Sequence, residues 1–414
     1  MVGQGHEGCS VEGVLSVRST LALAGFLGAT LLSVLGGCTE EADRPDLVTT
    51  ERDSSGVTIV EHVGIAGVAS GWRVRSRPVF RTGWHDDEPT FEFVMHGGIE
   101  KDGRILVSDA NAPKVYVMDS RGQVVKEIGR GGDGPGEFAV TVDAALAGPG
   151  DTIIAQDSYG LAIFDSGGVV ADRRSANAWR AGRVGLRLET RLADGSILMV
   201  PNSWSPTYGE SMWIQAPVGS LALDDLSLDT LFEMDFVKQH PRGHEESVPH
   251  GGMAAGRARW IATGRSDLAE IRRYDTGGSL ERVVRWDAAA AEVTDEDFER
   301  LAEAMRGWSS PELDSERVER MIRDRRESWE GPRPAFVHMR IDESGNVWVF
   351  DWTPGTADHE RGWIVGSDGA WLGAFDMPRP GRVLDVTDTH LLVLERDEYD
   401  VQAIALYEIV KPRG

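Results

Sequence analysis

The sequence predicts an all-β protein, a six-bladed β-propeller that carries a short insertion of two helices. Short apolar runs alternate with turn dipeptides or with Asp-x-x-Gly along most of the chain, which is typical of consecutive antiparallel hairpins. The hairpins recur 47 residues apart from Gly103 to Gly150 and 45 apart from Gly150 to Gly195. A four-stranded propeller blade occupies about 40 to 50 residues. The last repeat has only three strands, and an unpaired strand near Trp72 can complete it.

Composition limits the functions open to the protein. The chain has 414 residues, of which 41% are hydrophobic, so it can bury a large core. Lys and Arg total 43 against 67 Asp and Glu, and the net charge of −24 argues against nucleic acid as a partner. An acidic surface would suit cationic ligands or Ca²⁺, although solubility alone also explains it. The two cysteines, Cys9 and Cys38, precede the folded part, so no disulfide framework exists.

An apolar run near the amino end is typical of an export signal. Leu21–Leu35 has 15 residues. A membrane-spanning helix needs about 20, so the run fits the apolar region of a secretory signal instead. It ends in Leu35-Gly36-Gly37-Cys38, which resembles a bacterial lipobox, and the resemblance implies that Cys38 carries a lipid and becomes the new amino terminus. An ordinary signal with a chance cysteine and an uncleaved anchor are the alternatives.

These features divide the amino-terminal part in two. We expect a signal peptide over residues 1–37 and a polar tether over residues 38–70, in which 57–60 could form one short strand. Residues 1–17 contain two Glu and no Lys or Arg, unlike the basic start of a signal, which indicates that translation starts further downstream. The lipid would hold the protein to a membrane of the bacterial cell envelope, at the periplasmic face or in the outer membrane.

The predicted propeller covers residues 71–411. An extended strand over 72–81, interrupted by proline, would pair with the carboxy-terminal strands and remove the open edge of the ring. Each blade opens with an apolar run that ends at a turn. In chain order, the hairpins of the six blades are expected at 97–138, 146–168, 191–234, 259–286, 339–375 and 383–410.

The longer interval before the fifth blade predicts a helical insertion over residues 293–331. Thr294 followed by Asp295-Glu296-Asp297 is typical of a helix N-cap with an acidic first turn. Phe298, Leu301 and Met305 then share one helix face, and a second helix has a similar apolar face. The pair could be a lid over the central channel or a structural insertion packed on the propeller.

Several of these stretches together resemble NHL-type and TolB-like six-bladed β-propellers. The resemblance rests on the Asp-x-x-Gly hairpins and on the glycine-rich linker 129–138. A longer pattern resembles lipoproteins of bacterial cell envelopes that are described only as six-bladed propellers, and its matching parts are 51–57, 334–336, 342–349 and 397–401. The resemblance covers residues 51–411 and implies the fold, but it implies no activity.

Two motifs are candidates for ligand sites. Residues 129–134 match G-x-G-x-x-G, but Pro135-Gly136 follows where a dinucleotide site needs a helix, so we interpret them as a loop between blades. His240, His244 and His250 form the densest histidine cluster and are weak candidates for a Zn²⁺ site. Their spacing matches no standard motif, and a solvated loop between blades is the simpler interpretation.

Two acidic loops, 85–88 and 358–360, are weaker candidates for Ca²⁺ because they lack the ligand spacing of a calcium loop. The sequence contains no Gly-x-Ser-x-Gly, no P-loop and no His-Glu-x-x-His. We therefore predict no catalytic residue and no cofactor beyond the lipid on Cys38, with a divalent cation as an open possibility.

Two functions remain open from the sequence. The first is a lipid-anchored module or scaffold that binds a small molecule, a peptide or a protein at the mouth of the channel. The second is a lactonase-like hydrolase or lyase of the envelope that uses a divalent metal in the channel. Carboxylate, imidazole and amide side chains converging at the axis would favour the enzyme, and an apolar or plugged channel would favour binding.

Overall fold

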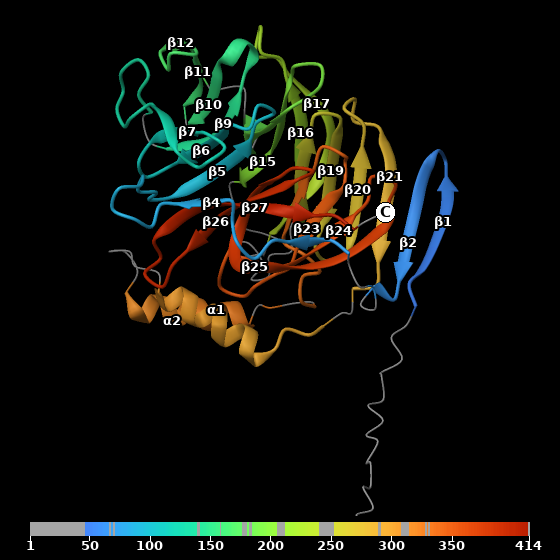
Figure 1. The fold of residues 1–414 in the computed structure, drawn as a ribbon. Helices are drawn as coiled ribbons and strands as arrows, with labels where there is room; N and C mark the ends of the chain where they lie inside the picture. Colours follow the sequence, from blue (N-terminus) through green and yellow to red (C-terminus); the bar gives the residue numbers. More distant parts are fainter. Residues whose placement is uncertain are drawn as a thin grey trace, which may run out of the picture. The chain divides into compact units, whose positions relative to one another are not determined.

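The computed structural model describes residues 46–412, except for 66–67, 69–70, 139–140, 158, 176–179, 182–183, 205–211, 240–251, 289–290, 308–313, 328 and 330–331. The strands of this part form five hydrogen-bonded sheets of four to eight strands (Figure 1). The eight-stranded sheet contains two blades, because the 16-residue strand β25 (Trp371–Val386) pairs with β24 through its first half and with β26 through its second. The described chain therefore has the six predicted blades.

Each blade is an antiparallel sheet whose strands follow one another in the chain. The first three blades contain β5 (Val94–Ile99), β6 (Ile105–Asp109), β7 (Lys114–Met118) and β8 (Val124–Ile128); β9 (Val142–Ala147), β10 (Ile153–Asp157), β11 (Gly160–Phe164) and β12 (Val170–Ser175); and β13 (Arg180–Ala181), β14 (Val184–Arg191), β15 (Ile197–Trp204), β16 (Met212–Leu221) and β17 (Leu228–Gln239). The fourth, fifth and sixth contain β18 (Gly252–Arg257), β19 (Trp260–Arg265), β20 (Glu270–Tyr274) and β21 (Leu280–Trp286); β22 (His338–Ile341), β23 (Val347–Phe350), β24 (His359–Val365) and β25; and β25, β26 (His390–Arg396) and β27 (Gln402–Val410).

The Asp-x-x-Gly turns are stabilised because the Asp carboxylate accepts hydrogen bonds from backbone N–H groups of the tight turn. Asp119 Oδ1 accepts the backbone N–H of Arg121 at 2.9 Å and of Gln123 at 3.0 Å. Gly122 has φ of 81°, a conformation that a residue with a Cβ adopts only under strain. The turns fix the hairpin register, and the register decides which side chains face the neighbouring blade.

The amino-terminal segment closes the ring as predicted. Two short strands, β3 (Arg73–Val74) and β4 (Phe80–Thr82), pair antiparallel with β27 and supply the missing fourth strand of the last blade. Trp72 is buried against Trp348 in an edge-to-face contact with ring centroids 5.6 Å apart. Closure therefore covers the edge of β27 that would otherwise be open.

The predicted tether over 38–70 is wrong for its second half. β1 (Val48–Ser54) and β2 (Val57–Val63) form a hairpin, and β2 runs parallel to β21 at the outer edge of the fourth blade (Figure 1). Val60 is buried between the fourth and fifth blades, and the buried His62 donates through Nε2 to the Gly369 carbonyl at 2.8 Å. Because burial alternates along the second half of β2, the hairpin has one face that packs on the blade. The spacing of whole blades does not predict this hairpin.

The core consists of apolar layers between neighbouring blades. Six buried clusters occur in the described chain, one between each pair of adjacent blades around the ring. Side chains such as Ile105, Leu188 and Val393 are fully buried in them. Each such side chain contributes about 1.5 to 3 kcal/mol by leaving water, so these layers dominate the stability of the ring.

The insertion forms the two expected helices, α1 (Asp295–Gly307) and α2 (Ser315–Glu327). Thr294 and Asp297 cap α1 reciprocally: Asp297 N donates to Thr294 Oγ1 at 3.1 Å, and Thr294 N donates to Asp297 Oδ2 at 3.0 Å. Neither helix of the described chain is long and apolar enough to cross a membrane.

Candidate functional site

A cavity of about 700 Å³ lies among the innermost strands of the ring. All six blades contribute to its wall, so it lies on the propeller axis. Among the residues that line it, six are basic and five are acidic, whereas acidic residues outnumber basic ones in the whole chain. The basic residues are Lys101, Arg104, Arg191, Arg257, Arg259 and Arg340, and the acidic ones are Glu100, Asp102, Glu189, Glu343 and Asp385.

Irregular pairing of the innermost strands helps to place these side chains. The register between β14 and β15 shifts at Glu189, the register of β9 shifts at Asp143, and that of β25 shifts at Leu384. A bulge inserts one extra residue and redirects the side chains around it. The shift beside Glu189 is one reason why an acidic side chain reaches the axis from a strand whose neighbouring leucines face the blade core.

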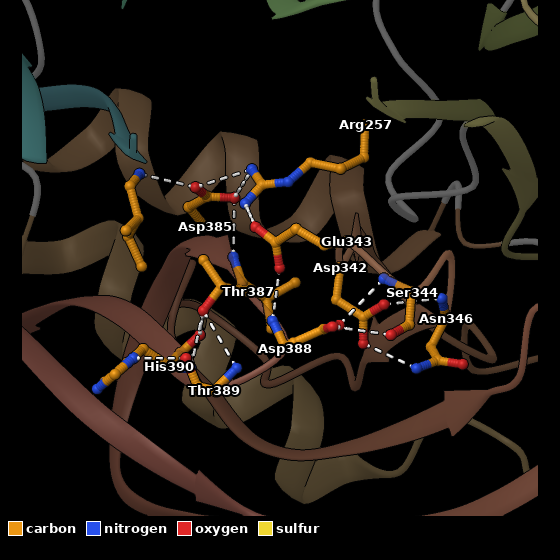
Figure 2. A network of polar contacts seen from close by, with 12 residues as sticks. Arg257, Asp342, Glu343, Ser344, Asn346, Asp385, Thr387, Asp388, Thr389 and His390 are labelled. Carbon is orange, nitrogen blue, oxygen red and sulfur yellow. Dashed lines mark hydrogen bonds and ion pairs between the residues drawn. The ribbon is translucent and has the colours of Figure 1, made fainter. Parts of the chain in front are cut away.

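A network of ion pairs at one side of the cavity joins the fourth, fifth and sixth blades (Figure 2). Arg257 donates through Nη1 to both oxygens of Asp385, at 3.0 and 3.1 Å, and through Nη2 to Glu343. Asp385 also accepts the N–H groups of Ile99 and Val386 at 2.8 Å each. Glu343 also accepts the Asp388 N–H at 2.6 Å. The pKa of Arg257 is raised, because the neighbouring carboxylates outweigh the effect of burial.

Most acidic groups of the cavity therefore have a cationic partner. Asp102 pairs with Arg104 at 2.6 Å, and Glu189 pairs with Arg187 at 2.8 Å. Glu100 is the cavity carboxylate with no cationic partner among the described residues; it accepts the Ala147 N–H at 3.1 Å. Burial raises the pKa of Glu100.

Arg340 lines the cavity, and two further guanidinium groups, those of Arg187 and Arg382, lie near it outside the lining. Glu189 bridges two of them, with Oε2 2.8 Å from Arg187 Nη2 and Oε1 3.6 Å from Arg340 Nη1. Arg340 also donates through Nε to the Leu384 carbonyl at 2.8 Å. Arg382, from the last blade, donates through Nη2 to the carbonyls of β5. We call Arg187, Arg340 and Arg382 the axial arginine cluster.

The pKa values of the basic groups around this cluster are lowered, which indicates a locally positive electrostatic field. Burial, together with the other arginines, lowers the pKa of Arg382 to about 10 and also lowers the pKa of Arg340. Burial and the same arginines hold the pKa of His96 and of His338 well below the usual value, so both imidazoles are neutral. This field is the opposite of what the net charge of the chain suggests.

Two stacked histidines lie beside the cluster. His338 and His359 have ring centroids 5.3 Å apart. His338 Nε2 donates to the Val383 carbonyl at 3.0 Å, and His359 Nδ1 donates to the Asp351 carbonyl at 3.1 Å. Burial lowers the pKa of His359 to about 4. The rings therefore act as neutral hydrogen-bond donors in the packed structure.

The structure does not describe the metal ligands that the sequence predicts. His240, His244 and His250 lie outside the described residues, as does the lipidation candidate Cys38. Within the described residues, no group of three or more His, Cys, Asp or Glu side chains is arranged to hold a metal ion.

The other candidate loops have structural roles. In the acidic loop 85–88, Glu88 accepts three backbone N–H groups, and in the loop 358–360, Asp358 pairs with Arg396 at 2.8 Å. The G-x-G-x-x-G stretch is a loop between blades as expected, with Phe138 buried in the layer between the first two.

The helical insertion packs away from the cavity mouth. Phe298 and Trp352 both contact the Trp329 ring, with centroids 5.3 and 5.5 Å away. Trp352 follows β23, whereas the cavity is lined by the turns that follow the innermost strands. Because β22 and β23 are antiparallel, the helices lie at the opposite end of the fifth blade from those turns. This position favours the structural interpretation of the insertion over the lid.

Sequence reasoning missed the axial arginine cluster, although a signal was present. His96, Asp143, His338 and Arg382 each stand seven residues before the turn residue that marks the repeat, namely Gly103, Gly150, Gly345 and Thr389. A polar residue at one fixed position of an otherwise apolar strand indicates a face that is not packed against a neighbouring blade.

Comparisons with known proteins agree with this architecture. A family model described as a 6-bladed β-propeller matches residues 98–165. No curated protein sequence matches the chain. A protein from Bacteroides fragilis that is described as exported aligns over 86% of this chain and 100% of its own, with 12% identity and a TM-score of 0.52.

A member of the duf4221 family from Bacteroides vulgatus aligns over 82% of this chain and 99% of its own, with 10% identity and a TM-score of 0.50. The chain is a six-bladed β-propeller. The propeller is also similar, at a TM-score of 0.44 and 10% identity, to the calcium-binding protein regucalcin from Agrobacterium tumefaciens, over 83% of this chain and 97% of that one. Likeness at these identities shows the fold alone, and the predicted resemblance to six-bladed propellers is confirmed.

Proposed function

We propose that this propeller is a binding module of the bacterial cell envelope that takes a small molecule into its axial cavity. The observation that carries the proposal is the cavity itself, about 700 Å³ in volume and walled by all six blades. Ligand pockets of proteins commonly enclose about 300 to 1,000 Å³ and combine apolar walls with a few oriented polar groups. The cavity meets the criterion of size, and its wall is richer in charged side chains than that of a common ligand pocket.

A lipid on Cys38 would hold the module at a membrane. The lipobox-like sequence and the preceding apolar run support this part of the proposal. The description of the Bacteroides fragilis propeller as exported supports an envelope location. Mass spectrometry of the mature protein tests it: we expect a first residue Cys38 carrying acyl chains, and an intact Met1 peptide would contradict it.

The metal-dependent hydrolase or lyase is the weaker hypothesis for the described residues. A divalent cation needs several free oxygen or nitrogen ligands. Asp385 and Glu343 are instead held by Arg257 and by backbone N–H groups, and Glu189 is held by two arginines. Carboxylates and the His96 imidazole do converge at the axis, as expected for the enzyme, but arginines pair with most of these carboxylates.

A cavity-filling variant tests the binding proposal. A Cβ added to Gly98, which lines the cavity, would meet one atom within 4 Å, Asp385 Oδ2 at 3.9 Å, so Gly98→Phe is chosen as the variant that fills the cavity. Wild-type protein and Gly98→Phe are screened by thermal unfolding against a library of neutral, anionic and cationic envelope metabolites. We expect at least one compound to stabilise the wild type and not the variant.

The matched control is Gly131→Phe, an exposed glycine outside the cavity with similar free space. The control should respond to the same compounds as the wild type. If no compound distinguishes Gly98→Phe from the wild type, the axial cavity is not the binding site.

A further inference from the structure

The three guanidinium groups of the axial arginine cluster, of which Arg340 lines the cavity, have one carboxylate at ion-pair distance among the described residues. Arg187 and Arg340 share the single carboxylate of Glu189, which is 8% exposed. Arg382 contacts backbone carbonyls of β5 instead of a carboxylate. Uncompensated buried charge is costly, and a group of opposite charge offsets that cost.

No further carboxylate among the described residues lies at ion-pair distance from Arg340 or Arg382. Arg396 pairs with Asp358 at 2.8 Å, and the field of Arg382 also acts on Asp358. Asp143 is subject to the field of Arg187, and burial raises the pKa of Asp143. Arg340 is also subject to the fields of Asp385 and Arg257, which pair with each other, and the adjacent imidazoles of His96 and His338 are neutral.

His96 adds an unused hydrogen-bonding group at the same place. The side chain is 7% exposed and lines the cavity, and its Nδ1 has no hydrogen-bond partner among the described residues. A buried polar atom without a partner is rare in a packed protein. A neutral imidazole can donate one hydrogen bond to an anion without adding to the charge of the site.

The mouth of the cavity carries three further cations. Lys101, Arg191 and Arg259 are exposed, line the cavity and make no ion pair with any residue in the described part of the chain. Unpaired cations around an opening attract anions by long-range electrostatics, even on a protein of negative net charge.

We infer that the ligand of the axial cavity carries an oxyanion, a carboxylate or a phosphate group, which contacts Arg340 and His96 at the floor. Guanidinium groups bind both oxyanions through paired N–H donors, so the two groups share one recognition chemistry. The inference rests on the proposed function, because it names the chemical class of the ligand bound in the same cavity.

Thermal unfolding in simple salts tests the inference with defined probes. Sodium phosphate and sodium acetate are titrated at constant ionic strength, with sodium chloride making up the difference. We expect saturable stabilisation of the wild type by at least one oxyanion. In Arg340→Gln, the loss of a charged hydrogen-bond donor should weaken the apparent affinity about tenfold or more.

Arg320→Gln is the matched control, because it removes the same charge from an exposed i,i+4 pair on α2 whose arginine is 49% exposed. It should respond to phosphate and acetate as the wild type does. Should Arg340→Gln fail to fold, the exposed double variant Arg191→Gln/Arg259→Gln replaces it, and its apparent affinity for the oxyanion should also fall.

The outcomes separate the inference from the function on which it rests. Stabilisation by phosphate alone or by acetate alone supports the inference and identifies the group. An absence of saturable stabilisation, or an equal effect in Arg340→Gln and the wild type, overturns it. If library compounds that distinguish Gly98→Phe are all neutral or cationic, the binding function stands and the oxyanion inference fails. If no compound distinguishes that variant, the proposed function itself fails.

Discussion

The layers that separate neighbouring blades consist of apolar side chains, whereas the axis of the ring is lined by charged ones. Between blades, side chains are apolar, and most are fully buried. At the axis, the innermost strands present arginines, histidines and carboxylates whose charges are only partly paired. The apolar layers therefore supply most of the stability of the ring. This stability offsets the cost of the axial charges, which is high when no ligand of opposite charge is bound.

The largest effect is expected where a layer is broken. Trp348 is 1% exposed, packs between the fifth and sixth blades, and donates through Nε1 to Asp342 at 3.0 Å. Trp348→Ala should lower the free energy of unfolding by about 3 to 5 kcal/mol, because it leaves a cavity and removes one of the hydrogen bonds to Asp342, which keeps those from Asn346. Urea unfolding measures the loss. Tyr399→Ala, at a residue that is 79% exposed, is the control and should change little.

A second test removes one partner of a buried ion pair at the axis. Arg257 and Asp385 are 16% and 10% exposed, and Arg257→Ala leaves Asp385 without its cation. We expect a loss of about 3 kcal/mol in urea unfolding. The exposed pair Arg361–Asp376 offers a control: Arg361→Ala should cost less than about 1 kcal/mol. Equal losses in the two variants would show that the axial pair does not stabilise the ring.

The axis should also make stability depend on pH. Unfolded His359 binds a proton below its ordinary pKa of about 6.5, whereas in the folded protein its pKa is about 4. Stability therefore falls as pH drops from 6.5 toward 4, by up to about 1.4 kcal/mol per pH unit from this residue. His96 and His338 act in the same direction.

Carboxylates with raised pKa, such as Asp351 and Asp358, act in the opposite direction, from the ordinary carboxylate pKa of about 4 up to their raised pKa in the folded protein. Comparing a histidine variant with the wild type between pH 7.5 and 5.5 removes this contribution, because both proteins contain the same carboxylates. His359→Asn should show a shallower slope of unfolding free energy against pH than the wild type, whatever its absolute stability. Parallel slopes would contradict a neutral, buried His359.

The same contrast explains what the sequence could predict. Blade number and ring closure follow from local turn chemistry and from apolar runs, so Asp119-x-x-Gly122 and the strand near Trp72 were sufficient to predict them. The hairpin β1–β2 was missed because its docking depends on a parallel contact with β21, far along the chain. Turn chemistry contains no information about such a contact.

The axial arginine cluster could not be predicted from the sequence, for a different reason. Arg187, Arg340 and Arg382 come from three blades and are three of 38 arginines in the chain. Their meeting depends on ring closure and on the register shift at Glu189, which no local pattern specifies. The fixed position of polar residues before each turn identifies the axial face, but it does not identify which charges remain unpaired there.

The smallest effect on stability is expected at the residue that matters most for the proposed ligand. Arg340 shares Glu189 with Arg187, so Arg340→Met leaves that carboxylate paired and relieves repulsion within the arginine cluster. Replacing a buried ion by an apolar side chain of similar size is often neutral or stabilising. Against this stands the loss of the hydrogen bond from Arg340 Nε to the Leu384 carbonyl.

We therefore expect Arg340→Met to change the free energy of unfolding by no more than about 1 kcal/mol in either direction. Urea unfolding in chloride buffer, with no other anion present, provides the measurement. A loss above about 2 kcal/mol would mean that Arg340 is a structural residue. A small change combined with weaker phosphate or acetate binding would mean that the ring tolerates repulsion at its axis because an anion relieves it.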